Sequence, residues 1–383
     1  MFLVALACLA FAGIALPDSV LGIAWPSMSA EFRQPVGALG VLLPFGVGAA
    51  VVSSALTGRL LTRVRMSRLL STATALSSLA LLGHSLAPSL GALVAATVLL
   101  GLGFGAMDAA LNAYAASHFG ARHINWMHAS YGLGAVIGPA AITTALGAGI
   151  DWRWTYGLMA TVLLALALTF TKAWPPQMAS PRPTPAEPGH RPGYTIASLS
   201  AAVFALHLGI EATISLWAYV YLTDGKGLTP WSAGFAVSSY WAVLCLSRVI
   251  LGPVAERVGA TRVLRASLTG MTAGALLMTV PGAPAPLAVA GMLLLGTAAA
   301  PMFPLLILTT AQRVGPAETP RTIGIQIAAS KLGAATFPAL TGLLIHHTDA
   351  RTLAPALLTL TTALSATFAA LTRRTPPRPT PHN

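Results

Sequence analysis

The sequence contains few charged residues for its length. Only 8% of its 383 residues are Asp, Glu, Lys or Arg, whereas 55% are hydrophobic. Soluble domains contain about 25% charged residues, so this chain has too few ionic groups to cover a soluble fold of its size. Lipid as the outer solvent removes that need. The composition therefore indicates an integral membrane protein and argues against a soluble enzyme.

Cysteine is nearly absent as well. Cys8 and Cys245 both lie inside apolar runs, far apart in the sequence. They offer neither a disulfide framework nor metal-ligand spacing, and we interpret them as small core residues. No metal triad, nucleophile elbow or phosphate loop is visible in the sequence. We therefore expect no enzyme activity, no metal and no cofactor.

Apolar runs of about 20 residues, the length that crosses a bilayer as a helix, recur along the chain. Proline and glycine between them, Pro26 among these, are expected to end the helices. The predicted spans are Phe2–Trp25, Leu39–Leu60, Leu69–Leu86, Leu90–Ser117, Ile124–Gly147, Trp154–Trp174, Ile196–Leu222, Ala233–Leu251, Val263–Val280, Leu287–Ala311, Ile323–Ile345 and Leu353–Leu371. The fold class is thus all-α, with twelve transmembrane helices. Because no basic tail precedes the first span, we expect the natural start to lie a few residues upstream.

A proline-rich segment divides the spans into two sets of six. Residues 175–195 have almost no apolar bulk, which is typical of a stiff, disordered linker. We predict one six-helix bundle at residues 1–174 and a second at 196–372. A disordered tail follows at 373–383.

The basic residues set the orientation. Suppose that the N-terminus is cytoplasmic. Of the 22 Lys and Arg residues, two then lie within spans, Arg248 and Lys331. Four lie in outer loops, namely Arg33, Arg153, Lys226 and Arg351. The other sixteen are then cytoplasmic, which the positive-inside rule favours. The net charge of +12 is therefore an orientation signal and does not indicate a nucleic-acid partner. We expect a multi-pass protein of the inner membrane with the linker and both termini in the cytoplasm.

The two halves repeat short motifs in the same order. Residues 58–63 read Gly-Arg-Leu-Leu-Thr-Arg and residues 252–257 read Gly-Pro-Val-Ala-Glu-Arg; Leu-Gly-Ala occurs at 133–135 and at 332–334. Parallel six-helix halves are the architecture of the major facilitator superfamily. The loop motif resembles that superfamily's cytoplasmic signature Gly-x-x-x-Asp-Arg-x-Gly, with Thr62 replacing the acid in the first copy. The resemblance implies a gating loop formed by Gly58, Arg63, Gly252, Glu256 and Arg257.

Several ionisable groups fall inside the predicted spans. A charge at the bilayer centre costs at least ~2.5 kcal/mol, so such groups usually serve transport. Asp108 and Asn112 are four residues apart and share a helix face, as do His207 and Glu211. The acid could carry a proton while the amide binds a hydroxyl, but a structural hydrogen bond remains open for each pair. For Arg248 we favour snorkelling to the interface. Lys331 lies too deep for that, so we expect it to pair with an acid or with substrate.

Three segments are similar to the fucose permease type within the superfamily. They are Asp108-x-x-x-Asn112-x-Tyr114, Gly209-x-Glu211 with Trp217 and Tyr221-Leu222, and Asn125-x-x-His128 leading to Tyr131-Gly-Leu-Gly134. The resemblance implies proton-linked sugar uptake with important acids in spans one and four, where Asp18 and Asp108 fall. Sugar carriers commonly have Glu where this chain has Asp108.

The predicted site therefore has two groups of residues in a monomer that binds a small molecule, protons and the lipid bilayer. The proton-coupling residues are Asp108, Asp18 and Glu211. The substrate-binding residues are Asn112, Asn125, His128, Tyr131, His207, Trp217, Tyr240, Gln326 and Lys331. Trp217 and Tyr240 could stack on a sugar ring or simply pack. The alternatives are a proton-antiporting exporter, which the drug-antiporter-like pair Gly138-Pro139 suggests, and a membrane-embedded enzyme that uses Asp108 and His128.

Overall fold

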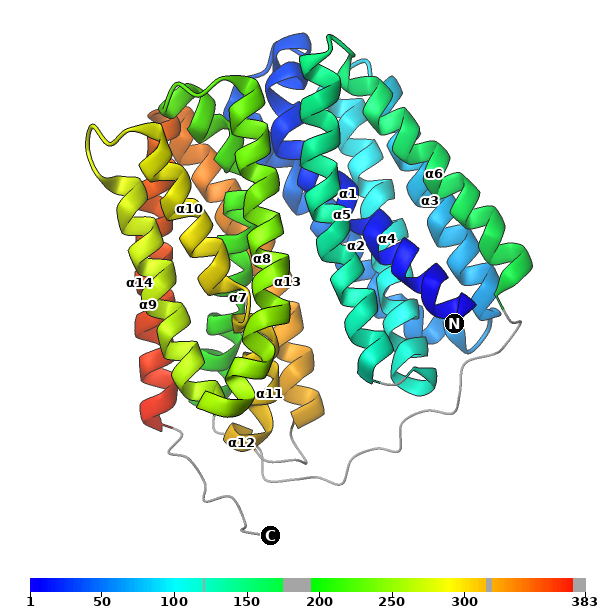
Figure 1. Ribbon diagram of the computed structural model, residues 1–383. Helices are drawn as coiled ribbons and strands as arrows, with labels where there is room; N and C mark the ends of the chain where they lie inside the picture. Colours follow the sequence, from blue (N-terminus) through cyan, green and yellow to red (C-terminus); the bar gives the residue numbers. More distant parts are fainter. Residues whose placement is uncertain (120, 175–193, 315–318, 375–383) are drawn as a thin grey trace. The chain divides into compact units, whose positions relative to one another are not determined.

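The computed structural model describes residues 1–119, 121–174, 194–314 and 319–374, and these form helices and turns without any strand (Figure 1). The long helices of the first half are α1 (Phe2–Glu31), α2 (Leu39–Leu61), α3 (Met66–Leu86), α4 (Leu90–His118), α5 (Ala121–Gly147) and α6 (Trp152–Ala173). Those of the second half are α7 (Tyr194–Val220), α8 (Pro230–Val258), α9 (Ala260–Thr279), α10 (Ala285–Ala299), α13 (Thr319–His347) and α14 (Leu353–Arg374). The short elements are η1 (Val36–Ala38), η2 (Tyr221–Gly225), α11 (Met302–Leu308), α12 (Thr310–Val314) and η3 (Ala350–Thr352).

Eleven of the described helical segments are long and apolar enough to cross a membrane. The helix α9 is not among them, because Arg262, Arg265 and several hydroxyl residues alternate with its apolar ones. Its buried residues, which include Leu264, Leu268 and Met271, recur every three or four positions and so form one face. The all-helical, polytopic fold expected from the sequence is confirmed.

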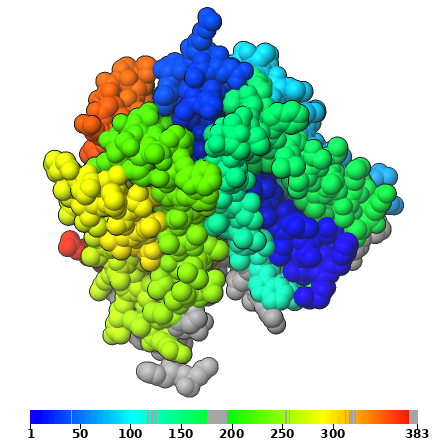
Figure 2. Space-filling view, turned by 45° about the horizontal axis from the view of Figure 1, so that its top comes forward, coloured from blue at the N-terminus to red at the C-terminus, as the bar shows by residue number. Residues whose placement is uncertain are grey.

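The chain forms two compact units. The first comprises residues 1–182 with two segments from later in the chain, 215–242 and 342–349. The second comprises residues 183–214, 243–341 and 350–383. Within the first unit, α1 packs on α5, α2 on α4, and α3 on both α4 and α6. In the space-filling view the dark-blue start of α1 lies between the surfaces of α5 and α6 (Figure 2).

Glycine permits close helix contacts in both units. A Cβ on Gly134 of α5 would collide with the carbonyl of Ala12 on α1, and one on Gly333 of α13 would collide with the carbonyl of Ala205 on α7. Small residues at such points let helix backbones approach in a membrane, where van der Waals packing drives association. These are the glycines of the repeated Leu-Gly-Ala motif, so the sequence repeat corresponds to a repeated packing contact.

One expectation about a helix end was wrong, and one predicted span contains an internal break. Pro26 lies inside α1, which continues to Glu31; proline is tolerated in membrane helices because neighbouring groups satisfy the carbonyl it leaves free. The tenth predicted span is not continuous, because α10 ends at Ala299 and α11 begins at Met302. Pro301 and Pro304 each lack the N–H that a continuous helix would require there.

The division into two six-helix bundles joined by a linker stays a prediction. The helix α7 begins at Tyr194 and α14 ends at Arg374. Most of the predicted linker, residues 175–193, and the tail 375–383 lie outside the described residues.

Candidate functional site

The acid of α4 is hydrogen-bonded within its own helix. Asn112 donates from Nδ2 to Asp108 Oδ1 at 2.9 Å, and also to the Asp108 backbone carbonyl at 2.9 Å. Both side chains are half-buried. The four-residue spacing thus brings acid and amide together, as the sequence indicates. The same amide could instead serve a ligand hydroxyl, because Asn carries both donor and acceptor atoms.

The acid of α1 is held by a residue from α5. The Tyr131 hydroxyl donates to Asp18 Oδ2 at 3.5 Å, and the Asp18 side chain is exposed. The close packing of Gly134 on α1, one turn from Tyr131, brings the two helices near enough for this contact. His128 lies one turn before Tyr131, and its ring meets the edge of Phe11 on α1 at 5.2 Å between centroids. The seam between α1 and α5 therefore carries three of the predicted site residues.

The second unit contains a buried ionic cluster. Glu211 Oε1 lies 3.4 Å from Arg248 Nη2 and 3.6 Å from His207 Nε2. His207 and Glu211 are buried, and neither ring nitrogen of His207 forms a hydrogen bond within the described residues. The shared face of α7 was expected, whereas the partner from α8 was not.

The snorkelling expectation for Arg248 was wrong. Its Nε donates to the Ala300 carbonyl at 3.2 Å, in addition to the ion pair with Glu211. Ala300 lies in the break between α10 and α11, and Pro304 has no N–H to donate to its carbonyl from the next turn. The guanidinium therefore finds two acceptors inside the unit, which is a better environment than an unpaired position in lipid.

Other predicted binding residues are buried in helix contacts. Gln326 of α13 donates from Nε2 to Ser200 Oγ of α7 at 2.5 Å and bonds Thr310 of α12 at 3.1 Å. Trp217 and Tyr240 are fully buried; the Trp217 ring lies against Gly342, and Tyr240 meets the edge of Trp241 at 5.7 Å. Lys331 is half-buried on α13. Gln326 therefore joins α13 to α7 and α12, and its amide nitrogen is occupied by contacts within the unit.

The predicted gating residues are only partly described. Gly58, Arg63 and Arg257 are exposed. The side chains of Asn125 and Glu256, and the surroundings of Gly252, lie outside the described set. Within the described chain no group of three or more His, Cys, Asp or Glu side chains could hold a metal.

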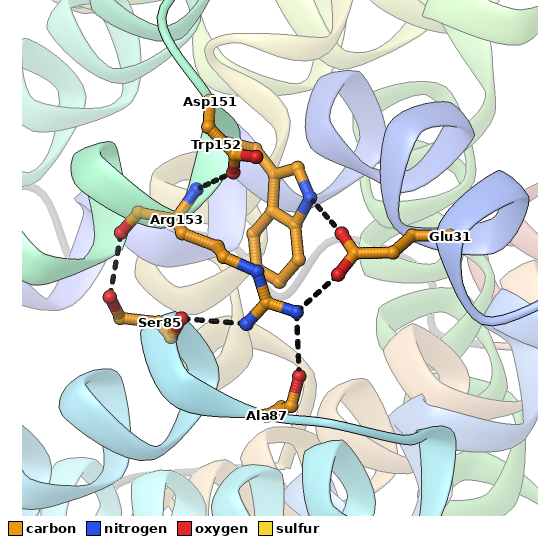
Figure 3. A network of polar contacts seen from close by, with 6 residues as sticks. All are labelled: Glu31, Ser85, Ala87, Asp151, Trp152 and Arg153. Carbon is orange, nitrogen blue, oxygen red and sulfur yellow. Dashed lines mark hydrogen bonds and ion pairs between the residues drawn. The ribbon is translucent and has the colours of Figure 1, made fainter.

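Sequence reasoning missed a polar network at one end of the first unit (Figure 3). Arg153, at the start of α6, donates to Glu31 at the end of α1, to the Ser85 carbonyl at 2.8 Å and to the Ala87 carbonyl at 2.8 Å. Trp152 Nε1 donates to the other Glu31 oxygen at 3.1 Å, and the Arg153 guanidinium lies 4.5 Å from the Trp152 ring centroid. The network ties α1, α3 and α6 together. The sequence indicates only an outer-loop cation at Arg153, because the partners of this residue are 66 to 122 positions away.

Comparisons with known proteins agree with the fold. The sequence matches the Major Facilitator Superfamily over residues 6–199 and 199–383. It is 30% identical over 328 residues to an uncharacterized transporter, y4wD, of Sinorhizobium fredii, covering 77% of this chain and 79% of the relative. Among solved structures, a bacterial homologue of the human lysosomal transporter Spinster has a TM-score of 0.81 at 12% identity and covers 100% of this chain and 98% of its own.

Two further solved structures are similar in fold. The nucleoside transporter NupG has a TM-score of 0.74 at 16% identity, over 97% of this chain and 99% of that one. A D-xylose-proton symporter has a TM-score of 0.75 at 12% identity, over 94% and 96% of the two chains. At these identities the likeness concerns the fold alone.

Proposed function

Because the chain belongs to the Major Facilitator Superfamily, we propose that this membrane transporter takes up a small polar solute, such as a sugar, together with protons. The single observation that carries the proposal is the hydrogen bond from Asn112 to the Asp108 carboxyl inside α4. A carboxyl group in a membrane helix is costly and usually serves transport. The similarity in fold to a D-xylose-proton symporter and to the nucleoside transporter NupG supports a polar solute.

The pair suggests how proton and solute binding are linked. A charged Asp108 holds the Asn112 amide by a charge-assisted hydrogen bond, which is stronger than a neutral one. Protonation of the acid weakens that bond, so the amide can turn to a solute hydroxyl. Proton binding thus favours solute binding, and by linkage solute binding favours proton binding to the same extent.

Two other acids have roles in this proposal. Asp18 with Tyr131 forms a second proton-accepting group, on the seam with α5. Glu211 is paired with Arg248, so its protonation would release the guanidinium. Alternating access requires the carrier to change state only in permitted loading states, and removal of an ion pair is one physical way to set that condition.

The experiment is paired uptake and counterflow in proteoliposomes with labelled L-fucose, D-galactose, D-xylose and nucleosides. The wild type should concentrate one of these solutes when a pH gradient is imposed. Asp108→Asn should abolish that accumulation while exchange of labelled for unlabelled solute continues. Asp224→Asn, at an exposed carboxylate in η2, is the matched control and should behave as wild type. Normal accumulation by Asp108→Asn would show that the acid is structural.

Solute binding provides a second measurement. Asn112→Ala should raise the solute concentration needed for half-maximal counterflow about fivefold or more, because a lost hydrogen bond typically costs about 1 kcal/mol. An unchanged value would remove Asn112 from the binding site.

The direction of transport can be measured in the same vesicles. Gly138-Pro139 in α5 resembles a drug-antiporter motif, and Gly138 packs closely on Leu16 and Ser19 of α1. If a pH gradient drives solute out of the compartment in which the proposed importer would accumulate it, the chain is an antiporting exporter.

The proposal also places the linker and both termini in the cytoplasm. A cysteine at position 184 in the linker should react with an impermeant thiol reagent only in lysed cells, whereas a cysteine replacing Thr348 should react in intact cells. Labelling of position 184 but not 348 in intact cells would show that the topology is the reverse of the proposed one.

A further inference from the structure

A groove on the surface of the second unit runs between α9 and α14, which lie side by side (Figure 1). It encloses about 670 Å³ and has Leu276 and Phe368 among its apolar lining residues, with Arg265 and Arg373 among its polar ones. Neither the transport site proposed above nor the ion pairs of the two units use these residues. The groove therefore needs its own explanation.

The two arginines lie at one end of the groove. Thr272 of α9 and Ser365 of α14 are within hydrogen-bond distance across it, at 3.5 Å. Because the two helices run in opposite directions (Figure 1), Arg265, two turns before Thr272, lies level with Thr372, two turns after Ser365. Arg373 is the next residue and belongs to the last turn of α14. Both guanidinium groups are thus at the end where α9 begins and α14 ends, and both side chains are exposed.

That end of the groove is cationic. In the described part of the chain neither Arg265 nor Arg373 forms an ion pair with a carboxylate. Beyond the arginines the groove is suited to hydrocarbon. The hydroxyls of Thr269, Thr272 and Thr372 are bonded to carbonyls of their own helices, at 3.1, 2.9 and 3.1 Å, so hydrocarbon can cover them at little cost.

From this arrangement we propose that the groove binds one anionic phospholipid, with the phosphate between Arg265 and Arg373 and an acyl chain along α9 and α14. The cationic end matches a lipid phosphate in charge, and basic pockets between transmembrane helices bind such headgroups. The apolar part lies deeper in the bilayer, where an acyl chain of the same lipid would lie. The bound lipid would cover the surface of α9, whose composition is the least suited of the long helices to face bulk lipid.

The test is lipid retention by the purified full-length protein in native mass spectrometry. Dioleoylphosphatidylglycerol is titrated against zwitterionic dioleoylphosphatidylcholine, and inorganic phosphate is the soluble competitor. The wild type should retain one phosphatidylglycerol in preference to phosphatidylcholine. Since each basic residue near a membrane surface contributes about 1 kcal/mol, Arg265→Gln with Arg373→Gln should weaken retention at least tenfold.

The matched control removes the same charge nearby. Arg262 and Arg374 belong to the same helix ends but do not line the groove, so Arg262→Gln with Arg374→Gln should retain the lipid. Ala369→Trp, at an exposed groove position, should block the acyl chain while both arginines remain. Equal losses of lipid retention in the two double variants would refute the site, because they would show that retention depends only on the general surface charge. Displacement by inorganic phosphate at the lipid's own concentration, or unchanged retention in Ala369→Trp, would refute the acyl-chain groove. Thermal unfolding confirms that each variant is folded.

Discussion

The Arg153 network offers a direct measurement of what holds the first unit together. Its guanidinium donates to two backbone carbonyls and to Glu31. Each carbonyl bond contributes about 1 kcal/mol. The exposed fractions of the Arg153 and Glu31 side chains are 25% and 43%, so water screens the ion pair and we assign it about 0.5 kcal/mol. Arg153→Gln, which can restore one weaker bond at most, should lose about 2 kcal/mol.

The assay is thermal unfolding in detergent, followed with a thiol-reactive dye on Cys8 and Cys245, which are partly buried in the folded protein. A loss of about 2 kcal/mol should lower the midpoint by about 4–8 °C. Arg153→Lys keeps the charge, but its ammonium cannot reach all three acceptors in the planar geometry of the guanidinium. Its midpoint should lie between those of wild type and Arg153→Gln.

Arg33 supplies the control for the loss of a cation. It is exposed, it lies two residues beyond the end of α1, and its φ of 52° lies in the left-handed region. Arg33→Gln keeps the same backbone constraint and removes one charge, so it should change stability by less than about 0.5 kcal/mol. If Arg153→Gln and Arg33→Gln have the same midpoint, the network in Figure 3 does not stabilise the unit and the reasoning fails.

Two further predictions concern helix packing and the buried cluster. Gly134→Ala and Gly333→Ala should each destabilise the protein by about 1–3 kcal/mol through overpacking. Gly58→Ala, which places nothing within 4 Å of the new Cβ, should be neutral or slightly stabilising by thermal unfolding. Equal effects of all three substitutions would refute the close contacts. Arg248→Gln alone should lower the midpoint more than the double variant with Glu211→Gln, because the single change leaves a buried carboxylate without its cation; a lower midpoint for the double variant would contradict the ion pair.

Sequence periodicity predicted contacts within a helix but could not predict those between helices. The Asp108–Asn112 and His207–Glu211 pairs follow from the 3.6-residue turn alone. The Tyr131–Asp18 contact joins residues 113 positions apart, and its existence depends on how closely α5 packs on α1. The span positions were predicted within a few residues at most ends, because apolar length and breakers are local properties.

The failures also have a physical reason. Whether a proline ends a membrane helix depends on which group satisfies the carbonyl it leaves free, and that partner is a tertiary contact. Pro26 does not end α1, whereas the pair Pro301 and Pro304 divides the tenth span. The sequence shows in each case that a proline lacks the backbone N–H. It does not show which group donates a hydrogen bond in its place.

At the break between α10 and α11 the donor that replaces the missing N–H is the charged side chain of Arg248. The helix geometry there is therefore linked to the ionisation of the cluster. Arg248 donates to the Ala300 carbonyl while it neutralises Glu211. About a third of its side chain, 34%, is exposed, so a ligand anion or water can compete for it. If Arg248 moved away, the Ala300 carbonyl would lose a donor and Glu211 would lose its cation at the same time. Protonation of Glu211 removes the second of these costs but not the first. We therefore expect the junction between α10 and α11 to rearrange whenever the ion pair opens, so that protonation of Glu211 would alter backbone structure at this break.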